Sequence, residues 1–89
     1  MPERIVTIVP EDGLHARPAS KFVEAANEFD STVKVGHVDG DLVNAASMLA
    51  VTGLGAAAGD EVRLTAEGED AEAALDELER ILTTPEDEL

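Results

Sequence analysis

Two stretches of the chain carry apolar side chains at the spacing of an α-helix, and each needs an apolar surface to cover its buried face. The first stripe consists of Ala19, Phe22, Val23 and Ala26, with Phe29 beyond them. The second stripe consists of Ala71, Ala74, Leu75, Leu78, Ile81 and Leu82. Residues 27–31 lose the first pattern and end that helix, and Gly68 with Asp70 marks the start of the second helix. Pro85 and the acidic residues 86–89 indicate a frayed tail. We expect both helices to pack on a sheet.

Short segments of strand-forming residues supply that sheet. Ile5–Val9 is a run rich in β-branched residues that Pro10 ends, because proline cannot donate to a strand ladder. Thr32–Val35 and Glu61–Thr65 alternate apolar and polar residues, as half-buried strands do. These three runs predict three of the strands.

The remaining elements lie between the second run and the last. The Asp39-Gly40 pair is typical of a hairpin turn and predicts a third strand at Asp41–Val43. Residues 44–55 predict a short helix that is capped from Asn44 and stopped by its glycines. The predicted order is therefore β-α-β-β-α-β-α. It indicates an α+β fold, a four-stranded antiparallel sheet with three helices on one face, forming a single domain over residues 1–89.

The chain is strongly acidic. Its 89 residues include 20 Asp and Glu against 6 Lys and Arg, which gives a formal net charge of −14 at pH 7. Nucleic acid and anionic membrane surfaces would repel such a chain, so neither is expected as a partner. The acids are spread along the whole length, which a salt-rich cytoplasm tolerates because the Debye length falls to about 3 Å at 1 M salt. We therefore expect a halophilic source.

The many carboxylates of the chain are scattered and do not show the His/Asp/Glu spacing that a metal site needs. The sequence has no cysteine, which excludes disulfides and thiolate metal sites. Its two histidines do not make a metal site, and we interpret His37 as an exposed residue of the hairpin. We expect neither a metal nor a cofactor. No apolar run approaches the roughly 20 residues of a membrane span and no signal-peptide core follows Met1, so a cytoplasmic location is the default expectation.

The segment Gly13-Leu14-His15-Ala16-Arg17-Pro18 sets a histidine and an arginine at a predicted helix start. Proline fits the first turn of a helix, where its missing N–H would have no partner. The unpaired amides and the helix dipole make that end a site for anions. A neutral imidazole is nucleophilic near pH 7. We expect Nδ1 of His15 to accept a phosphoryl group, the amides of Ala16 and Arg17 to receive its oxygens, and the Arg17 guanidinium to stabilise it.

Each of these residues also has a plainer interpretation. A single histidine at a helix start is more often a cap or a surface residue than a nucleophile. Arg17 alone would be a solvated charge, and Pro18 would only mark the start of a helix. The combination within one helical turn favours the chemical interpretation.

The segment Gly13–Ala19 resembles the active-site signature of the HPr family, the histidine-containing phosphocarriers of the phosphoenolpyruvate-dependent sugar phosphotransferase system. Val43–Met48 with Leu54-Gly55 resembles the family's segment around its regulatory serine, at the spacing that the family shows. The likeness continues through Gly59-Asp60 and Gly68–Ala71, so it covers nearly the whole chain. It implies the HPr-like open-faced β-sandwich.

The resemblance also implies a relay. Enzyme I, phosphorylated from phosphoenolpyruvate, would donate to His15, which would pass the group to a sugar-specific enzyme II A component. The chain would be a stoichiometric carrier and not a complete enzyme. It shows no Ser-His-Asp arrangement and no acid and base around His15 that would indicate a hydrolase. We expect it to be a monomer.

Ser47 has two interpretations. Its hydroxyl suits the first turn of the middle helix, and it also matches the serine that a dedicated kinase phosphorylates in some lineages of the family. Ala46 and Ala50 stand where relatives are often basic, and Glu11 and Asp12 add negative charge before the histidine. We therefore expect the partner contact to consist of Met48, Leu49, Leu54 and Arg17, with salt screening the remaining charges.

Two alternatives stay open at this stage. One is a carrier with the same chemistry that serves a phosphoenolpyruvate-dependent dihydroxyacetone kinase. The other is a regulatory module that docks on an enzyme or a transcription factor without onward transfer. Intact His15 and Arg17 count against the second alternative, because a docking module needs neither.

Overall fold

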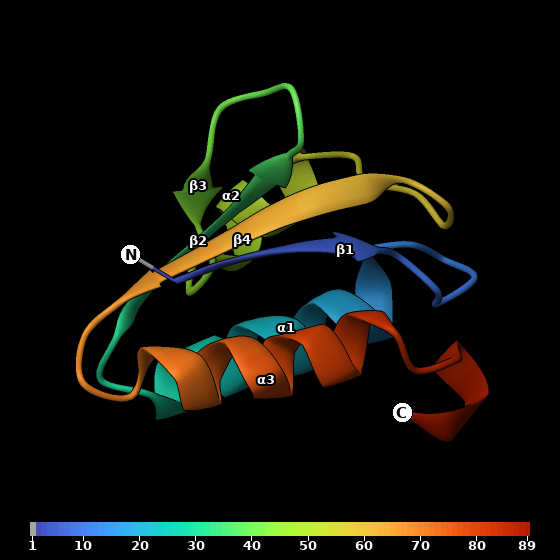
Figure 1. The fold of residues 1–89 in the computed structure, drawn as a ribbon. Helices are drawn as coiled ribbons and strands as arrows, with labels where there is room; N and C mark the ends of the chain where they lie inside the picture. Colours follow the sequence, from blue (N-terminus) through green and yellow to red (C-terminus); the bar gives the residue numbers. More distant parts are fainter. Residues whose placement is uncertain (1) are drawn as a thin grey trace.

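Four strands form one antiparallel sheet in the spatial order β1-β4-β2-β3 (Figure 1). The computed structural model describes residues 2–89. The strands are β1 (Glu3–Thr7), β2 (Thr32–His37), β3 (Val43–Asn44) and β4 (Glu61–Glu67). The longest strand, β4, lies between β1 and β2 and pairs with both. The predicted four-stranded antiparallel sheet is confirmed.

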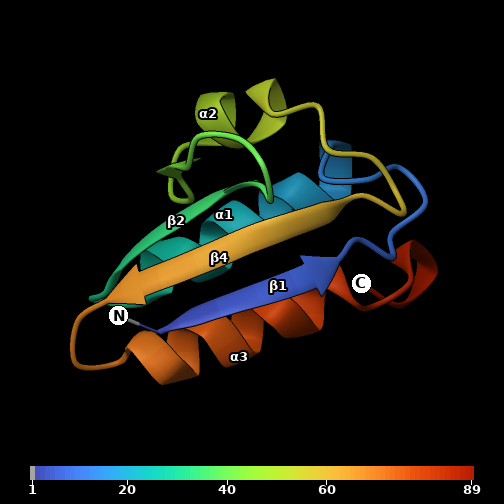
Figure 2. The ribbon, with the colours of Figure 1, turned by 45° about the horizontal axis from the view of Figure 1, so that its top comes forward.

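The helices are α1 (Ala16–Glu28), α2 (Met48–Gly53) and α3 (Ala71–Leu82), followed by the 3₁₀ turn η1 (Glu86–Glu88). Helices α1 and α3 lie side by side under the sheet, and α3 runs along β1 and β4 (Figure 2). Helix α2 packs against α1 and β3. The opposite face of the sheet has no helix on it among the described residues, which confirms the predicted open-faced α+β sandwich.

The core lies between the sheet and the two long helices. Both predicted stripes supply it, since Phe22 of α1 and Leu78 of α3 are fully buried. From β4 the alternate residues Val62, Leu64 and Ala66 point into the same layer and are also fully buried. Two aromatic residues in the whole chain leave aliphatic side chains to fill most of this core.

The strand boundaries differ from the sequence prediction. Strand β1 covers Glu3–Thr7 and not residues 5–9, because its ladder with β4 ends at the Thr7–Glu61 pair. The amides of Ile8 and Val9 donate instead to carbonyls of Asp60 and Leu82, outside the ladder. Strands β2 and β4 each extend two residues beyond the predicted ends, because they pair with each other along that length.

The third strand and the middle helix also begin later than expected. Asn44 belongs to β3, and its Oδ1 accepts a hydrogen bond from the Ala46 amide at 2.9 Å, so it closes a turn before the helix. The cap of α2 is Ser47, whose Oγ accepts from the Ala50 amide at 3.2 Å. The prediction of a cap at Asn44 was wrong, because its side chain bonds two residues ahead and leaves the amides of α2 to Ser47.

Asp70 joins the two connections at the other end of the sheet. Its carboxylate accepts hydrogen bonds from the Ser31 hydroxyl and from the amides of Asp30 and Ser31, both amide bonds being 2.9 Å long. These bonds, the Ser31 hydroxyl foremost, lower the pKa of Asp70. Gly68 lies against Ser31 with φ +144, and a Cβ there would be 2.8 Å from the Ser31 Cα. The link between α1 and β2 is thereby fastened to the start of α3.

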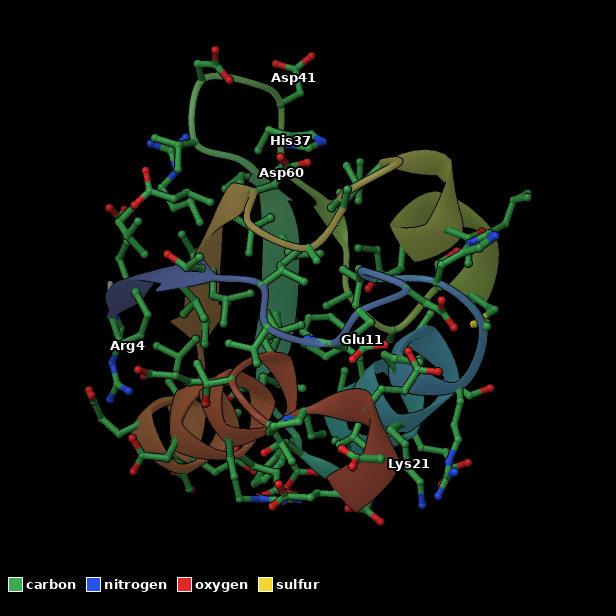
Figure 3. All side chains as sticks on the ribbon, turned by 90° about the vertical axis from the view of Figure 1, so that its right-hand side faces the viewer. Arg4, Glu11, Lys21, His37, Asp41 and Asp60 are labelled. Atoms are coloured by element: carbon green, nitrogen blue, oxygen red, sulfur yellow. The ribbon has the colours of Figure 1, made fainter. Side chains whose placement is uncertain are left out.

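Arg4 is surrounded by carboxylates of α3 at the β1 edge (Figure 3). Its guanidinium lies 2.7 Å from Glu79, 2.9 Å from Asp76 and 3.7 Å from Glu72. Hydrogen bonds to Glu79 and Asp76 raise the pKa of Arg4, so the cation persists at any ordinary pH. One basic residue thus offsets part of the negative charge that α3 carries.

Candidate functional site

The loop before α1 is shaped by Gly13 and anchored by Leu14. Gly13 has φ +71, and a Cβ built on it would lie 2.4 Å from the Ala56 carbonyl oxygen and 2.7 Å from the Ala57 Cα. Leu14 is buried, and its amide donates to that Ala56 carbonyl at 2.9 Å. These contacts fix the backbone that delivers the next residue, His15.

His15 is the exposed N-cap residue of α1, with extended backbone angles of φ −149 and ψ 165. Its carbonyl accepts from the Ala19 amide at 3.3 Å, while its side chain makes no capping hydrogen bond within residues 2–89. Of the plainer interpretations, His15 is the N-cap by position and is exposed, but its side chain does not cap the helix. The imidazole is free for chemistry at the positive end of a thirteen-residue helix.

The helix begins at Ala16, within the predicted segment Gly13–Pro18, and Pro18 is buried in its first turn. Ala16 has φ +48, and among residues 2–89 it is the one residue other than glycine with a positive φ. Such backbone conformations cost of order 1–3 kcal/mol and persist where the surroundings hold them. The strained residue is thus the one directly after His15.

An open hollow of about 230 Å³ lies beside His15 and is hereafter called the His15 hollow. One wall comes from the loop before α1 and the other from the end of α2 and the segment that follows it. Its lining residues are Asp12, Leu14, His15, Thr52, Gly55, Ala56 and Ala57. Two segments far apart in the sequence therefore line one hollow.

Arg17 is exposed and its Nη2 donates a 2.6 Å hydrogen bond to the carbonyl oxygen of Leu89. The segment Glu86–Glu88 forms the 3₁₀ turn η1, and Leu89 packs half-buried against the core. The Asp12 amide donates to Glu86 Oε1 at 3.1 Å. The prediction of a frayed tail was wrong, because these polar contacts and the apolar Leu89 side chain hold the segment in place.

Glu86 and Asp12 bring two carboxyl groups together next to the His15 loop. The Asp12 side chain raises the pKa of Glu86, and this effect exceeds the lowering by the hydrogen bond from the Asp12 amide. The pair adds negative charge to the approach to His15.

Helix α2 presents an apolar surface that we call the α2 patch, made of Met48, Leu49 and Leu54. Leu49 is 84% exposed and Met48 is 39% exposed, while Leu54 is half-buried at the C-cap of the helix. Thr52 of the same helix lines the His15 hollow, so the patch adjoins it. Three of the four residues predicted for partner contact thus lie together next to the predicted phosphoryl acceptor, and the fourth, Arg17, lies in α1.

Sequence reasoning also missed a contact made by His37. His37 lies at the end of β2 (Figure 3) and is half-buried. Its Nε2 lies 2.9 Å from the Leu54 carbonyl oxygen. The interpretation of His37 as an exposed hairpin residue was therefore wrong. No local pattern marks this pair, because seventeen residues separate its members in the sequence.

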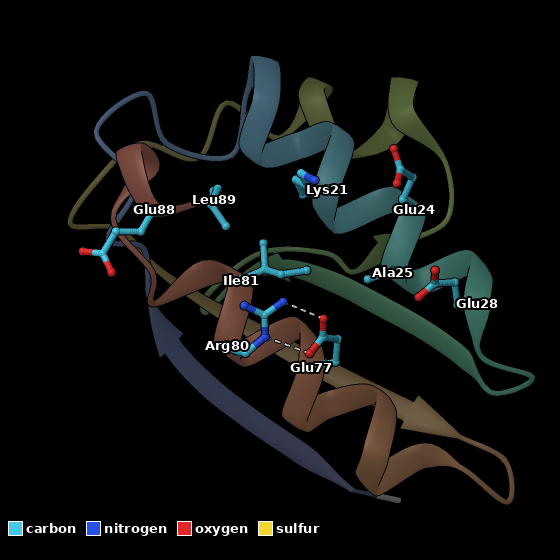
Figure 4. A pocket seen from close by; sticks show the side chains of 9 residues that line it. All are labelled: Lys21, Glu24, Ala25, Glu28, Glu77, Arg80, Ile81, Glu88 and Leu89. Atoms are coloured by element: carbon cyan, nitrogen blue, oxygen red, sulfur yellow. Dashed lines mark hydrogen bonds and ion pairs between the residues drawn. The ribbon is translucent and has the colours of Figure 1, made fainter.

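A second hollow of about 230 Å³ lies between α1 and α3, on the side away from the sheet (Figure 4). Its rim is charged, and Arg80 is paired with Glu77 by two hydrogen bonds of 2.9 and 2.7 Å. This hollow contains neither histidine. Among residues 2–89 no group of His, Asp and Glu side chains is arranged to hold a metal ion, and none of the helices there is long and apolar enough to cross a membrane.

Comparison with known proteins places this geometry in context. Residues 2–84 match the family described as "PTS HPr component phosphorylation site". The phosphocarrier protein HPr of Haloferax volcanii is 72% identical over 85 residues, covering 94% of this chain and 96% of that protein. The phosphocarrier protein HPr of Streptomyces coelicolor is 49% identical and covers 100% of this chain and 96% of its own length.

Among solved structures, that of the phosphocarrier protein HPr from Bacillus anthracis superimposes with a TM-score of 0.87 at 36% identity. The match covers 91% of this chain and 95% of that one. The likeness to the Haloferax protein is consistent with the halophilic source that the charge predicts.

Proposed function

The chain belongs to the HPr family of phosphocarriers of the phosphotransferase system, and from this membership we propose that it accepts a phosphoryl group on His15 from phosphorylated enzyme I. It then passes the group to a sugar-specific enzyme II A component during phosphoenolpyruvate-dependent sugar uptake. The observation that supports this most is an exposed imidazole that makes no capping hydrogen bond within residues 2–89, set at the start of α1 and beside a hollow. The relay takes place in the cytoplasm.

In the proposed step, the lone pair of His15 Nδ1 attacks phosphorus in line with the bond to the donor. That bond breaks, and its electron pair stays on the donor group. The phosphoryl oxygens approach the amides of Ala16 and Arg17, where the helix dipole favours negative charge. The strained φ of Ala16 supports this arrangement, since strain of this kind gathers at functional sites.

Arg17 stabilises the charge of the transferring group with its guanidinium. The guanidinium must first exchange its hydrogen bond to the Leu89 carbonyl for one to phosphate. Hydrogen bonds from a guanidinium to phosphate oxygens are charge-assisted and are of the strong kind. The chain is a stoichiometric phosphocarrier, and its phosphohistidine is an intermediate of the relay.

We propose that enzyme I and the enzyme II A component dock on the α2 patch. The patch is apolar, and Ala46 and Ala50 lie on either side of Ser47, the cap of α2, in the sequence. Glu11 and Asp12 precede the histidine in the sequence and add negative charge there. Apolar burial does not weaken as salt rises, whereas attraction between exposed charges does. Affinity for the cognate enzyme I should therefore be retained in molar salt and should not rise when salt is removed.

Ser47 has a structural task as the cap of α2. A serine kinase that phosphorylated it would add a dianion next to Met48 and weaken partner docking.

We propose that the carrier is a monomer, which sedimentation in molar salt tests.

The function is tested by phosphorylation in molar salt with phosphoenolpyruvate and the cognate enzyme I. The native chain should acquire one acid-labile, base-stable phosphate, and His15→Ala should acquire none. His37→Ala, which removes the other histidine, should still acquire one phosphate at saturating concentration of the carrier. A folded native chain that takes no phosphate from an active enzyme I would refute the proposal and favour a docking module. Transfer to a dihydroxyacetone kinase component, with none to any enzyme II A, would change the acceptor and leave the carrier chemistry intact.

A further inference from the structure

The hydrogen bond between His37 and Leu54 joins the sheet to the end of helix α2. His37 is the last residue of β2, and its register partner Val62 lies in the central strand β4. Leu54 is the C-cap residue of α2, and its carbonyl is 2.9 Å from His37 Nε2. A carbonyl at the end of a helix has no partner within the helix, so an outside donor satisfies it. Since the acceptor is a carbonyl, Nε2 of His37 must carry a proton.

The chain that follows Leu54 forms one wall of the His15 hollow. Gly55, with φ +64, turns the backbone, and Gly55, Ala56 and Ala57 line the hollow. The Ala56 carbonyl then accepts the 2.9 Å hydrogen bond from Leu14, the residue directly before His15. A continuous series of short contacts therefore leads from His37 to the backbone of the phosphoryl acceptor.

The far end of this wall is fastened independently. Asp60 Oδ2 accepts from the Ala57 amide at 2.9 Å, and the Asp60 carbonyl accepts from Ile8 at 2.9 Å. At the near end, the α2 side, the amides of Leu54 and Gly55 bond only to α2 itself within the described residues. The His37 bond is thus the hydrogen bond that joins the near end to the sheet, and it acts beside the packing of the Leu54 side chain against the core.

We infer that His37 is a positioning residue for phosphoryl transfer. Its bond to the Leu54 carbonyl holds one wall of the His15 hollow in place. Because Leu54 also belongs to the α2 patch, the same bond holds part of that patch. His37 touches neither phosphate nor donor, and it acts through Leu54 and Ala56. The inference rests on the proposed function, because it concerns the same transfer.

The test compares three variants as phosphoryl acceptors from phosphorylated enzyme I in molar salt. His37→Ala removes the donor, and we expect it to raise the KM for the carrier about threefold to tenfold, as loss of one hydrogen bond at a contact does, with kcat changed less than twofold. His37→Gln places an amide N–H near the position of Nε2 and should restore KM to within about twofold. Val38→Ala, the next residue along and exposed, is the matched control and should leave both constants unchanged.

Amide hydrogen exchange gives a readout that does not depend on enzyme I. In His37→Ala the Leu14 amide, bonded to Ala56, should exchange several-fold faster, while the amides of the β1–β4 ladder keep their protection. His37→Gln should keep the native exchange rate at Leu14.

Three results would overturn the inference. The first is a KM of His37→Ala equal to that of the native chain. The second is an exchange rate of the Leu14 amide in that variant equal to the native rate. The third is loss of protection throughout the sheet, which would show a general structural role instead. Failure of the native chain to accept phosphate would instead refute the proposed function, and the exchange comparison would still decide whether His37 positions Leu14.

Discussion

Arg17 and Leu89 are joined by a 2.6 Å hydrogen bond from the guanidinium Nη2 to the backbone carbonyl. The side chain proposed to stabilise the transferring phosphoryl group is therefore engaged by the far end of the described chain. Because Arg17 is exposed, the bond competes with water and with any anion that approaches His15. The segment after α3 thus belongs to the environment of the site.

Deletion of residues 86–89 should release Arg17 and remove the Glu86 carboxylate from the loop before His15. We expect phosphoryl transfer from enzyme I to become about twofold to tenfold faster. This range is the net free energy of one hydrogen bond converted to a ratio of rates. Rapid-quench measurement of phosphate incorporation in molar salt provides the check. A slower reaction in a truncated chain of native melting temperature would show that the segment assists Arg17 instead of restraining it.

Gly13→Ala should destabilise the fold by about 2–4 kcal/mol, because it combines a positive φ with a collision against backbone atoms. The Ala56 carbonyl and the Ala57 Cα cannot move aside as a flexible side chain would. Gly53→Ala is the matched control, since Gly53 is helical and has no atom within 4 Å of its Cβ position. That control should be neutral or stabilising by up to about 1 kcal/mol. Urea unfolding of both variants in molar salt measures the difference, and equal stabilities would contradict the described geometry.

Asp70→Asn should remove part of the acid sensitivity of folding. Hydrogen bonds from the Ser31 hydroxyl and the backbone amides depress the folded-state pKa of Asp70 below its unfolded value. The carboxylate therefore contributes stability above the unfolded pKa of about 4, and this contribution is lost as pH falls through the folded pKa. The native chain should lose more stability than Asp70→Asn between about pH 5 and pH 2. Parallel curves of unfolding free energy against pH would refute this role for Asp70.

Ser47→Ala should cost about 0.5–2 kcal/mol, because the hydroxyl of Ser47 caps α2 through the Ala50 amide. Ser47→Asp keeps an acceptor at the cap but places a charge beside Met48, so it should bind enzyme I more weakly while remaining folded. Calorimetric titration with enzyme I separates the two effects. Native affinity in Ser47→Asp would remove Ser47 as a candidate regulatory site.

The sequence was sufficient to predict α1 and α3 because each carries a long apolar stripe, as the buried Phe22 and Leu78 show. It was also sufficient for the start of α1, where Pro18 permits few alternatives. The strand ends could not be predicted, since Ile8 and Val9 are as apolar as the ladder residues but find their partners elsewhere.

The site was predicted in part. A local motif marked His15 and Arg17, because their positions follow from one loop and one helix start. The bond from His37 to Leu54 and the bond from Arg17 to Leu89 connect residues 17 and 72 positions apart. Such contacts arise when the sheet and helices pack, and no periodicity in a single sequence records them.

The most direct test of the central claim is to locate the phosphoryl group on the phosphorylated native chain by ³¹P and ¹⁵N NMR in molar salt. The chain carries two imidazoles, one at an open helix start and one hydrogen-bonded to a carbonyl. Because their environments differ, the ¹⁵N signals of the two rings can be told apart. The account predicts phosphorus on Nδ1 of His15 and an unchanged protonated Nε2 on His37. Phosphorus on His37, or on neither ring of a folded chain exposed to active enzyme I, would contradict it.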